Sequence, residues 1–269
     1  MDRQSRADAL DMEMATRLMP SEAVTALVEW WAQHSETYRD GPGAHAVIYT
    51  PSRWASITPW PGGLVPTSDS TDSRVSRAEV TRMVSDALNR EAWTEALVAT
   101  FVWGMGKSGT PRGSGPYVLS QILRCSNLDQ ELATAVNSLR EHGAVPAYAR
   151  LRGTVSGLGP SFFTKFLYFV GQALPVIPGR RPLILDRTLA RSMRHRAAAV
   201  GRETGLDPDG SVAAWLWTDA GWSAHRYDVY LFFMHAVSRQ LTSSPDWPSG
   251  AAPDLVELAL FSGCLPSSG

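Results

Sequence analysis

The chain has 269 residues, of which 44% are hydrophobic, and this length and composition indicate a globular protein of one large domain or two small ones. No apolar run approaches the ~20 residues that span a bilayer, and the opening residues lack the apolar segment of a signal peptide. We therefore expect a cytoplasmic protein with no membrane partner. Two isolated cysteines, Cys125 and Cys264, exclude a four-cysteine iron–sulfur cluster, and we expect no metal site or disulfide framework.

The charge of the chain is unevenly distributed although its net value is only −1. Between Lys107 and Arg202 there are 14 Lys or Arg against four Asp or Glu, so the rest of the chain sums to −11. A basic segment of this kind is what phosphate binding by one face requires. A solvated basic surface with no ligand would give the same pattern. Of the 25 basic side chains only two are lysines, Lys107 and Lys165, which directs attention to both.

The first part of the chain reads as one helix followed by an irregular region. Residues 21–38 open with a serine cap and continue with helical apolar spacing. From residue 41 to about residue 73 the chain is rich in Pro, Gly, Ser and Thr, which predicts loops with space for a small hairpin near residues 46–49. We place a domain boundary here, with residues 1–75 as an N-terminal region and residues 76–269 as a helical domain.

Helical periodicity dominates the remainder, and strand signals are almost absent. The predicted fold class is therefore all-α, or mostly α. Helices are predicted over residues 74–104, as two helices that meet near Asn89, and over 116–125, 127–142, 144–152, from 160 onward, 187–200, 211–217, 227–239 and 254–261.

A glycine-rich basic loop, Gly104–Gly109, has the composition of a nucleotide-binding loop but not its context. A P-loop needs a glycine five residues before Gly106, where Phe101 stands, and a dinucleotide fingerprint follows a strand, whereas a helical pattern precedes this loop. The loop amides with Lys107 and Arg112 are candidates for contact with a phosphate backbone. A plain connector between helices is the alternative.

Residues 151–169 have the outline of a helix-hairpin-helix. Gly157 and Gly159 suit a tight turn with positive φ, and Pro160 suits the first turn of the second helix. The exposed amides of that first turn can meet a phosphate without an intervening side chain. An ordinary connection between two helices would show the same residues.

Lys165 lies in this second helix among large apolar side chains that cover most of its circumference. A buried lysine amine can act as a nucleophile, whereas a guanidinium stays protonated and cannot form a Schiff base. A lysine that merely extends to solvent is the alternative. Asp186 follows an apolar triplet and is placed to cap the next helix. The same carboxylate suits stabilisation of positive charge on a sugar as its base departs.

The segments 157–169 (GLGPSFFTKFLYF) and 183–186 (LILD) resemble the helix-hairpin-helix DNA glycosylase superfamily, and within it the bacterial 8-oxoguanine DNA glycosylase-like (OGG-fold) family. The likeness extends from about Phe101 through Phe261. It implies two helical subdomains that flank a DNA-binding cleft, a monomeric state, and double-stranded DNA with a modified base as the partner.

The resemblance also implies roles for single residues. Lys165 would attack C1′ of a flipped nucleotide, Asp186 would assist, and Gly157, Gly159 and Ser161 would hold the DNA backbone. The chain departs from the classical members in one respect, because they carry the catalytic lysine where this chain has Ser161. Without a working lysine the enzyme would be monofunctional, with water as the nucleophile and no lyase step.

Aromatic side chains supply candidates for the base pocket, since a flipped base is read by stacking. We select Trp103, Tyr168 and Trp222, with plain core packing as the alternative. No organic cofactor is expected, and a monovalent cation at the hairpin is left open.

The substrate and the activity each leave an alternative. By resemblance the base is 8-oxoguanine, and the alternative is a bulky hypermodified viral base, such as a glycosylated pyrimidine, which would make this a defence enzyme. A non-catalytic DNA-binding module and a nucleotide-using protein built on the glycine-rich loop are the other classes of function.

Overall fold

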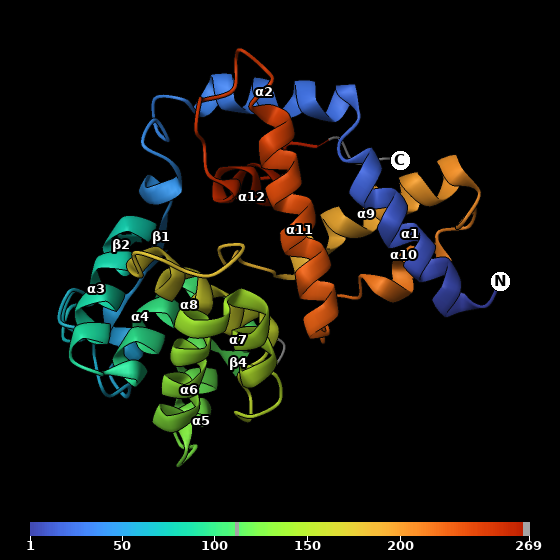
Figure 1. Ribbon diagram of the computed structural model, residues 1–269. Coiled ribbons are helices and arrows are strands. Elements are labelled where there is room, and N and C mark those ends of the chain that lie inside the picture. Colours follow the sequence, from blue (N-terminus) through green and yellow to red (C-terminus); the bar gives the residue numbers. More distant parts are fainter. Residues whose placement is uncertain (111–112, 266–269) are drawn as a thin grey trace. The chain divides into compact units, whose positions relative to one another are not determined.

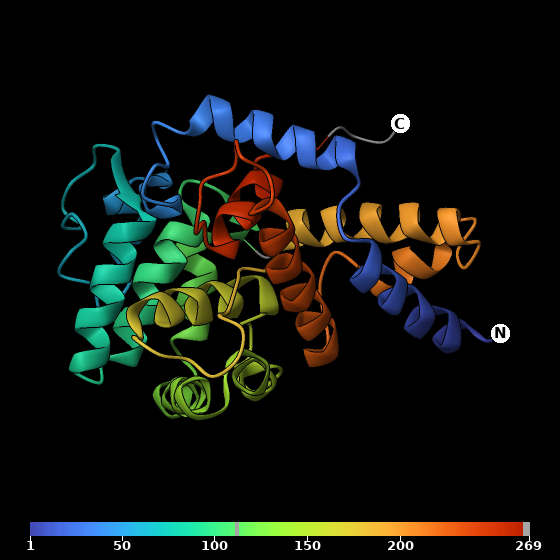
Figure 2. The ribbon, with the colours of Figure 1, turned by 45° about the horizontal axis from the view of Figure 1, so that its top comes forward.

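The structure is a computed structural model, and it describes residues 1–110 and 113–265. In these residues the chain forms twelve α-helices and two small two-stranded sheets, which confirms the mostly helical class. Contacts within the chain divide it into two compact units (Figures 1 and 2). Unit 1 contains Met1–Pro42 and Leu185–Gly269, and unit 2 contains Gly43–Ile184. Unit 2 is therefore inserted in sequence between the two parts of unit 1.

Unit 1 is built from both ends of the chain. Its helices are α1 (Arg3–Arg17), α2 (Ser21–His34), α9 (Arg187–Thr204), α10 (Ser211–Leu216), α11 (Ala224–Leu241) and α12 (Pro253–Phe261). In Figure 1 the blue α1 runs beside the orange α9 and α10, and contacts place it against α11 as well. Helix α2 packs on α12. The N-terminal helices thus complete a core to which the C-terminal helices contribute the larger share.

Helix α1 was not predicted from the sequence. Its buried side chains are Ala7, Leu10 and Met14, whose spacing of three and four residues forms a narrow apolar stripe. An ion pair between Arg226 and Asp11 joins α11 to α1, and the Arg226 side chain is only 8% exposed. This short apolar stripe is sufficient to fix α1 in unit 1 because the ion pair and the contacts with neighbouring helices also stabilise its position.

Unit 2 contains the remaining elements. They are β1 (Ala46–Tyr49), β2 (Ser73–Ser76), α3 (Arg77–Asn89), α4 (Trp93–Met105), β3 (Gly109–Thr110), β4 (Gly113–Ser114), α5 (Gly115–Ile122), α6 (Leu128–His142), α7 (Ala144–Leu151) and α8 (Pro160–Ala173), with 3-10 turns η1 (Pro42–Ala44) and η2 (Pro51–Trp54) on either side of β1.

The predicted irregular region contains one strand of a pair whose partner lies far along the chain. Strand β1 pairs antiparallel with β2 in a register that sets Ala46 opposite Ser76 and Tyr49 opposite Ser73. The predicted boundary at residues 75 and 76 falls at the end of β2, where Ser76 and Glu79 form the capping box that starts α3. Strand β2 therefore continues directly into the helical part of unit 2.

The core of unit 2 is the contact between α4 and α8. Every residue from Ala96 to Trp103 in α4 is buried, and so is every residue from Phe163 to Gly171 in α8. A helix without a polar face is buried on all sides, and both sequences are almost uniformly apolar over these stretches. Helices α3, α6 and α7 also pack on α8.

A buried cation lies beside these two helices. Arg77, the first residue of α3, is 2% exposed, and its guanidinium carbon lies 5.2 Å from the ring centre of Trp103 and 5.1 Å from that of Tyr168. It also donates hydrogen bonds of 3.3 Å to the Tyr168 hydroxyl and to Nδ1 of His45. Aromatic faces and hydrogen bonds together offset the cost of removing the charge from water.

His45 is kept neutral by this arrangement. Burial, and secondly the nearby Arg77 cation, lower the pKa of His45 from 6.5 to about 4. The neutral ring is the form whose Nδ1 can accept the hydrogen bond from Nε of Arg77.

This depressed pKa predicts a loss of stability in weak acid. Between pH 6.5 and about pH 4 the unfolded chain binds a proton at His45 that the folded chain does not, so stability falls as the pH is lowered through that window. The variant His45→Asn keeps an acceptor but does not titrate, and we expect a smaller fall. Thermal unfolding of both proteins at pH 7 and pH 4.5 measures the difference, and equal losses would contradict the assignment.

Candidate active site

Lys165 is in the middle of α8 and is 7% exposed. Its neighbours Thr164 and Phe166 are fully buried, so the lysine has no polar face of the helix to occupy. The prediction of a helix buried around its lysine is confirmed. An ordinary surface lysine, extended into solvent, is not what the structure contains.

The aliphatic part of Lys165 lies against a glycine of α4. A Cβ added at Gly104 would come within 2.9 Å of Cδ and 3.5 Å of Cε of Lys165. Real Cβ atoms essentially never approach a heavy atom that closely. Gly104 therefore provides the space through which the lysine side chain passes.

The amine of Lys165 reaches back to the first turn of α8. Nζ donates a 2.9 Å hydrogen bond to the carbonyl oxygen of Ser161, four residues earlier. Helical side chains point toward the N-terminus of their helix, so a long side chain ends about one turn before its own Cα. The displacement of the lysine from position 161 to 165 is thereby offset, because the amine returns to the level of Ser161.

A partly exposed aromatic ring accompanies the amine. Phe162 stacks on Phe101 with 4.2 Å between ring centres, and Nζ of Lys165 lies 5.9 Å from the centre of the Phe162 ring. Sequence reasoning did not select Phe162. Its position in the sequence could have indicated it, because Phe162 stands three residues before Lys165 and side chains at i and i+3 of a helix are neighbours.

The turn before α8 has the predicted positive φ at one of its two glycines. Gly157 has φ +83°, a conformation that favours glycine. The prediction was wrong for Gly159, which is the N-cap of α8 and has the extended backbone usual for that position, with φ −82°. Pro160 has no N–H, and within the described residues the Ser161 amide has no hydrogen-bond acceptor. The beginning of α8 thus offers a backbone N–H at the positive end of the helix dipole.

The glycine-rich loop after α4 is explained largely by packing. Gly106 has φ +52°, and a Cβ there would lie 2.8 Å from the carbonyl oxygen of Ile48 in β1. Lys107 is half exposed and forms a 2.5 Å ion pair with Asp72, whose pKa is lowered chiefly by this contact. Arg112, the other predicted phosphate contact of the loop, lies outside the described residues.

Asp186 begins α9 in unit 1. Its Oδ1 accepts hydrogen bonds from the amides of Thr188 at 3.0 Å and Leu189 at 3.2 Å, which confirms the predicted N-cap. The side chain is partly exposed. The two residues predicted to be catalytic thus belong to different units, Lys165 to unit 2 and Asp186 to unit 1.

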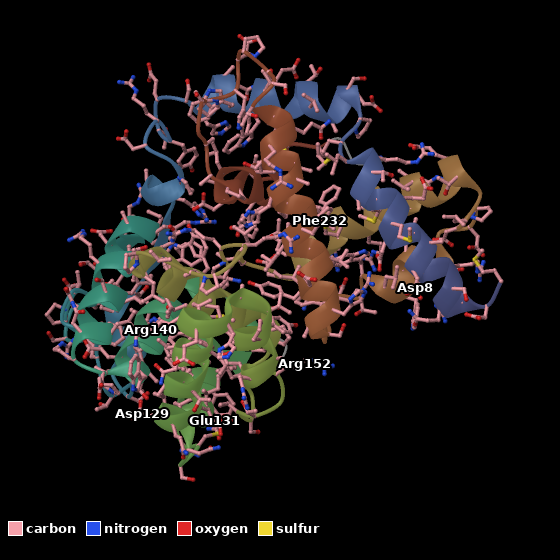
Figure 3. The ribbon with its side chains drawn as sticks, in the orientation of Figure 1. Asp8, Asp129, Glu131, Arg140, Arg152 and Phe232 are labelled. Atoms are coloured by element: carbon pink, nitrogen blue, oxygen red, sulfur yellow. The ribbon has the colours of Figure 1, made fainter. Side chains whose placement is uncertain are left out.

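The basic segment of the sequence is shared between the two units. In unit 2, α6 carries Asp129 and Glu131 in its first turn and Arg140 near its end (Figure 3), an order that complements the helix dipole. In unit 1, α9 carries five arginines and no acid before Glu203. The helix dipole accounts for the order of the charges on α6 but not for the excess of arginines on α9.

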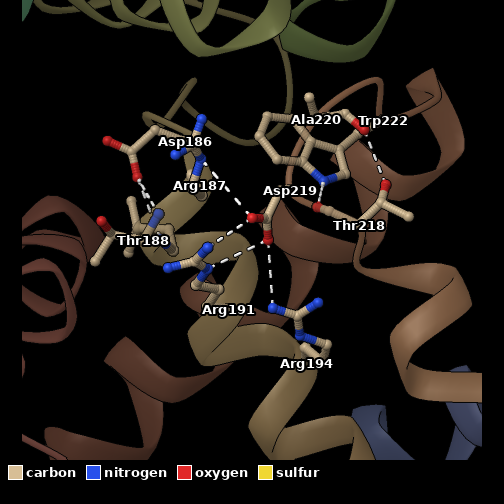
Figure 4. A network of polar contacts seen from close by, with 10 residues as sticks. Asp186, Arg187, Thr188, Arg191, Arg194, Thr218, Asp219, Ala220 and Trp222 are labelled. Atoms are coloured by element: carbon tan, nitrogen blue, oxygen red, sulfur yellow. Dashed lines mark hydrogen bonds and ion pairs between the residues drawn. The ribbon is translucent and has the colours of Figure 1, made fainter. Parts of the chain in front are cut away.

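Three of the α9 arginines converge on one carboxylate. Asp219 accepts from Arg191 at 2.6 Å and 3.2 Å and from Arg194 at 3.3 Å, and it lies 3.9 Å from Nε of Arg187 (Figure 4). These contacts, that with Arg191 foremost, lower the pKa of Asp219. Sequence reasoning missed this cluster because Asp219 lies more than twenty residues beyond the arginines and no local pattern connects them.

The three predicted base-pocket rings all have packing partners. Trp103 and Tyr168 flank Arg77 in unit 2. Trp222, in unit 1, is 2% exposed, and its Nε1 donates a 2.8 Å hydrogen bond to the Thr218 carbonyl in the loop that carries Asp219 (Figure 4). Each ring therefore has a structural role in its own unit, whatever further role it has toward a base.

Among the helices within residues 1–110 and 113–265, none has the length and apolar character needed to span a membrane. No group of three or more His, Cys, Asp or Glu side chains there is arranged to hold a metal ion.

Comparison with known proteins identifies a family. A family model described as "Putative 8-oxoguanine DNA glycosylase OGG-like protein" matches residues 40–261. No match was found among curated proteins or among solved structures. The matched region contains the hairpin, Lys165 and Asp186, and it begins well before Phe101, the expected start of the likeness. The chain therefore belongs to the OGG family of 8-oxoguanine DNA glycosylase-like proteins, whose fold is a helix-hairpin-helix fold.

Proposed function

We propose that this protein is a DNA glycosylase that extrudes a modified base from duplex DNA and cleaves its N-glycosidic bond, with Lys165 as the nucleophile. The observation that carries the proposal is the position of the Lys165 amine. It belongs to one of only two lysines in the chain, it is buried, and it ends beside Ser161 at the hairpin. An arginine at this place could not form a covalent intermediate with the sugar.

In the proposed reaction the C1′–base bond breaks and its electron pair goes to the base, which takes up a proton. The lone pair of the Lys165 amine forms a bond with C1′. The role proposed for Asp186 is electrostatic: its carboxylate offsets the positive charge that develops on a sugar as the base departs. The amine then loses a proton, its lone pair forms a double bond to C1′, and the C1′–O4′ electron pair goes to O4′, which takes up a proton, so that a Schiff base results. Loss of a proton from C2′ with departure of the 3′ phosphate is the lyase step, and addition of water to the imine frees Lys165.

The hairpin supplies the proposed contact with the DNA backbone. The Ser161 amide and the backbone of Gly157 and Gly159 receive a phosphate at the start of α8, where the helix dipole favours an anion. Lys107 contributes only if its ion pair with Asp72 opens. We propose that a monomer acts on double-stranded DNA, and the proposed chemistry calls for no organic cofactor.

Family membership favours an oxidised purine of the 8-oxoguanine type as the substrate. One observation favours a second candidate, a bulky hypermodified base such as a glycosylated pyrimidine of viral DNA. Residue 161 is a serine where the classical members have a lysine, and a smaller side chain at this position favours a larger base. In that case the protein serves defence rather than repair.

The first test is borohydride trapping on duplexes that contain 8-oxoguanine, other oxidised bases or glucosylated hydroxymethylcytosine. We expect the wild type to form a covalent adduct with one duplex and Lys165→Gln to form none, while its affinity for DNA stays within a few-fold. Gln is polar enough to keep a hydrogen bond to the Ser161 carbonyl. Base release without an adduct would identify a monofunctional enzyme, and release unaffected by Lys165→Gln would contradict the proposed nucleophile.

The second test separates the two roles of Asp186. Asn caps helices as well as Asp does, so Asp186→Asn should retain the hydrogen bonds to Thr188 and Leu189 and the thermal unfolding midpoint. The loss of charge should nevertheless slow base release by about 10²-fold or more. Single-turnover kinetics on the duplex found by trapping measure the rate, and an unchanged rate would leave Asp186 with capping alone.

The third test concerns the space for the lysine. Gly104→Ala places a methyl group against the Lys165 side chain, and we expect at least a tenfold loss of trapped adduct because small displacements of reacting groups are costly. Alanine favours a helix over glycine, so α4 itself is not weakened. Gly62→Ala is the control, since no atom lies within 4 Å of its added Cβ. Equal activity of the two variants would show that Gly104 does not position the amine.

A further inference from the structure

We propose that Arg187, Arg191 and Arg194 form a phosphate clamp, held in place by Asp219, that grips the backbone of the DNA strand next to the nucleotide on which Asp186 acts. This inference rests on the proposed function for its location, and it adds a binding surface and a positioning residue. The clamp lies entirely within unit 1.

The three arginines lie on one face of α9 because their spacing of four and three residues matches the helical turn. Figure 4 shows their guanidinium groups gathered around Asp219, with Asp186 at the start of the same helix. Arg187 directly follows Asp186 in sequence. A backbone bound along this face therefore runs past the residue that caps the helix.

The charge of the cluster is unbalanced. Three cations meet one carboxylate, which leaves a local excess of two positive charges. Asp219 reduces the repulsion among the guanidinium groups but does not neutralise them. Exposed ion pairs contribute little to stability, so folding alone does not account for three arginines around one acid. The excess is what a ligand with more than one negative charge would require.

The arginines also keep hydrogen-bond donors directed elsewhere than at Asp219. Arg191 uses Nε and one terminal nitrogen for Asp219, and Arg194 uses one terminal nitrogen. The side chains of Arg187, Arg191 and Arg194 are 55%, 51% and 29% exposed. Arginine binds phosphate oxygens through paired N–H groups, and the remaining donors of the cluster are available for that geometry.

Asp219 is a positioning residue in this scheme, and its own loop is well anchored. It lies between α10 and α11, where Trp222 donates to the Thr218 carbonyl at 2.8 Å and the Thr218 hydroxyl donates to the Ala220 carbonyl at 2.8 Å. These bonds close the loop on both sides of Asp219 (Figure 4). The carboxylate thus presents a fixed point around which the long arginine side chains are ordered before DNA arrives.

The clamp is tested by DNA binding rather than by base release. The probe is a fluorescent duplex with a tetrahydrofuran abasic analogue, titrated by anisotropy at several salt concentrations between 50 and 200 mM. We expect Arg191→Ala and Arg187→Ala each to weaken binding and to lower the slope of log Kd against log salt by about 1, as the loss of one phosphate contact does. The unfolding midpoint should not change.

The matched control is Arg90→Ala. Arg90 is 55% exposed and forms a two-bond ion pair with Glu95, so it resembles Arg191 in exposure and pairing but stands outside the clamp. We expect its variant to bind as the wild type does. Unchanged slopes for the α9 variants, or an equal change for Arg90→Ala, would overturn the clamp.

The role of Asp219 has its own readout. Asp219→Asn retains all three cations, so simple charge neutralisation predicts tighter binding to abasic and unmodified duplexes alike. Positioning predicts that the preference for the abasic duplex falls, by at least threefold, because the arginines no longer hold one arrangement. Equal tightening on both duplexes would overturn the role of Asp219.

The outcome is independent of the catalytic proposal. If the α9 variants lose affinity but no duplex yields released base or adduct, the glycosylase proposal fails and the clamp stands. If base release depends on Lys165 but the α9 variants bind normally, the clamp fails and the glycosylase proposal stands.

Discussion

Burial of α8 on every side determines where the amine of Lys165 ends. Because the residues around the lysine are all buried, its side chain cannot turn outward along a polar face of the helix. It passes Gly104 of α4 instead and reaches the carbonyl of Ser161. The core of unit 2 therefore serves the candidate site directly, since the same contact between α4 and α8 that stabilises the unit also directs the nucleophile.

The arginines of this chain are of two kinds, and the contacts of each show whether its charge serves packing or is directed to solvent. Arg77 is buried between two aromatic rings and hydrogen-bonded to Tyr168 and His45, so its charge contributes to the packing of unit 2. Arg187 and Arg191 of α9 are exposed, Arg194 is partly exposed, and the three outnumber the single acid that they contact, Asp219. In the sequence both are simply arginines, and only the contacts distinguish a structural cation from one directed outward.

The sequence predicted features that depend on local patterns. The helices from α3 onward, the hairpin at Gly157 and the N-cap at Asp186 follow from periodicity and capping chemistry, which operate over a few residues. It did not predict the pairing of β1 with β2, the contacts of Arg77 or the assembly around Asp219, since each joins residues that lie more than twenty positions apart. Helix α1 is different, because its apolar stripe at residues 7, 10 and 14 was readable but short.

Unit 1 consists of two segments that are separated in sequence by unit 2, so its parts are synthesised at different times. Helices α1 and α2 leave the ribosome before unit 2, but their packing partners, α9 to α12, are translated only after unit 2. Unit 2 is continuous in sequence and can fold as soon as it emerges, since domains fold as units during synthesis. During synthesis Lys165 is therefore held in its buried helix before Asp186 has a folded unit around it. The apolar stripe of α1 stays uncovered until α9, α10 and α11 have been made.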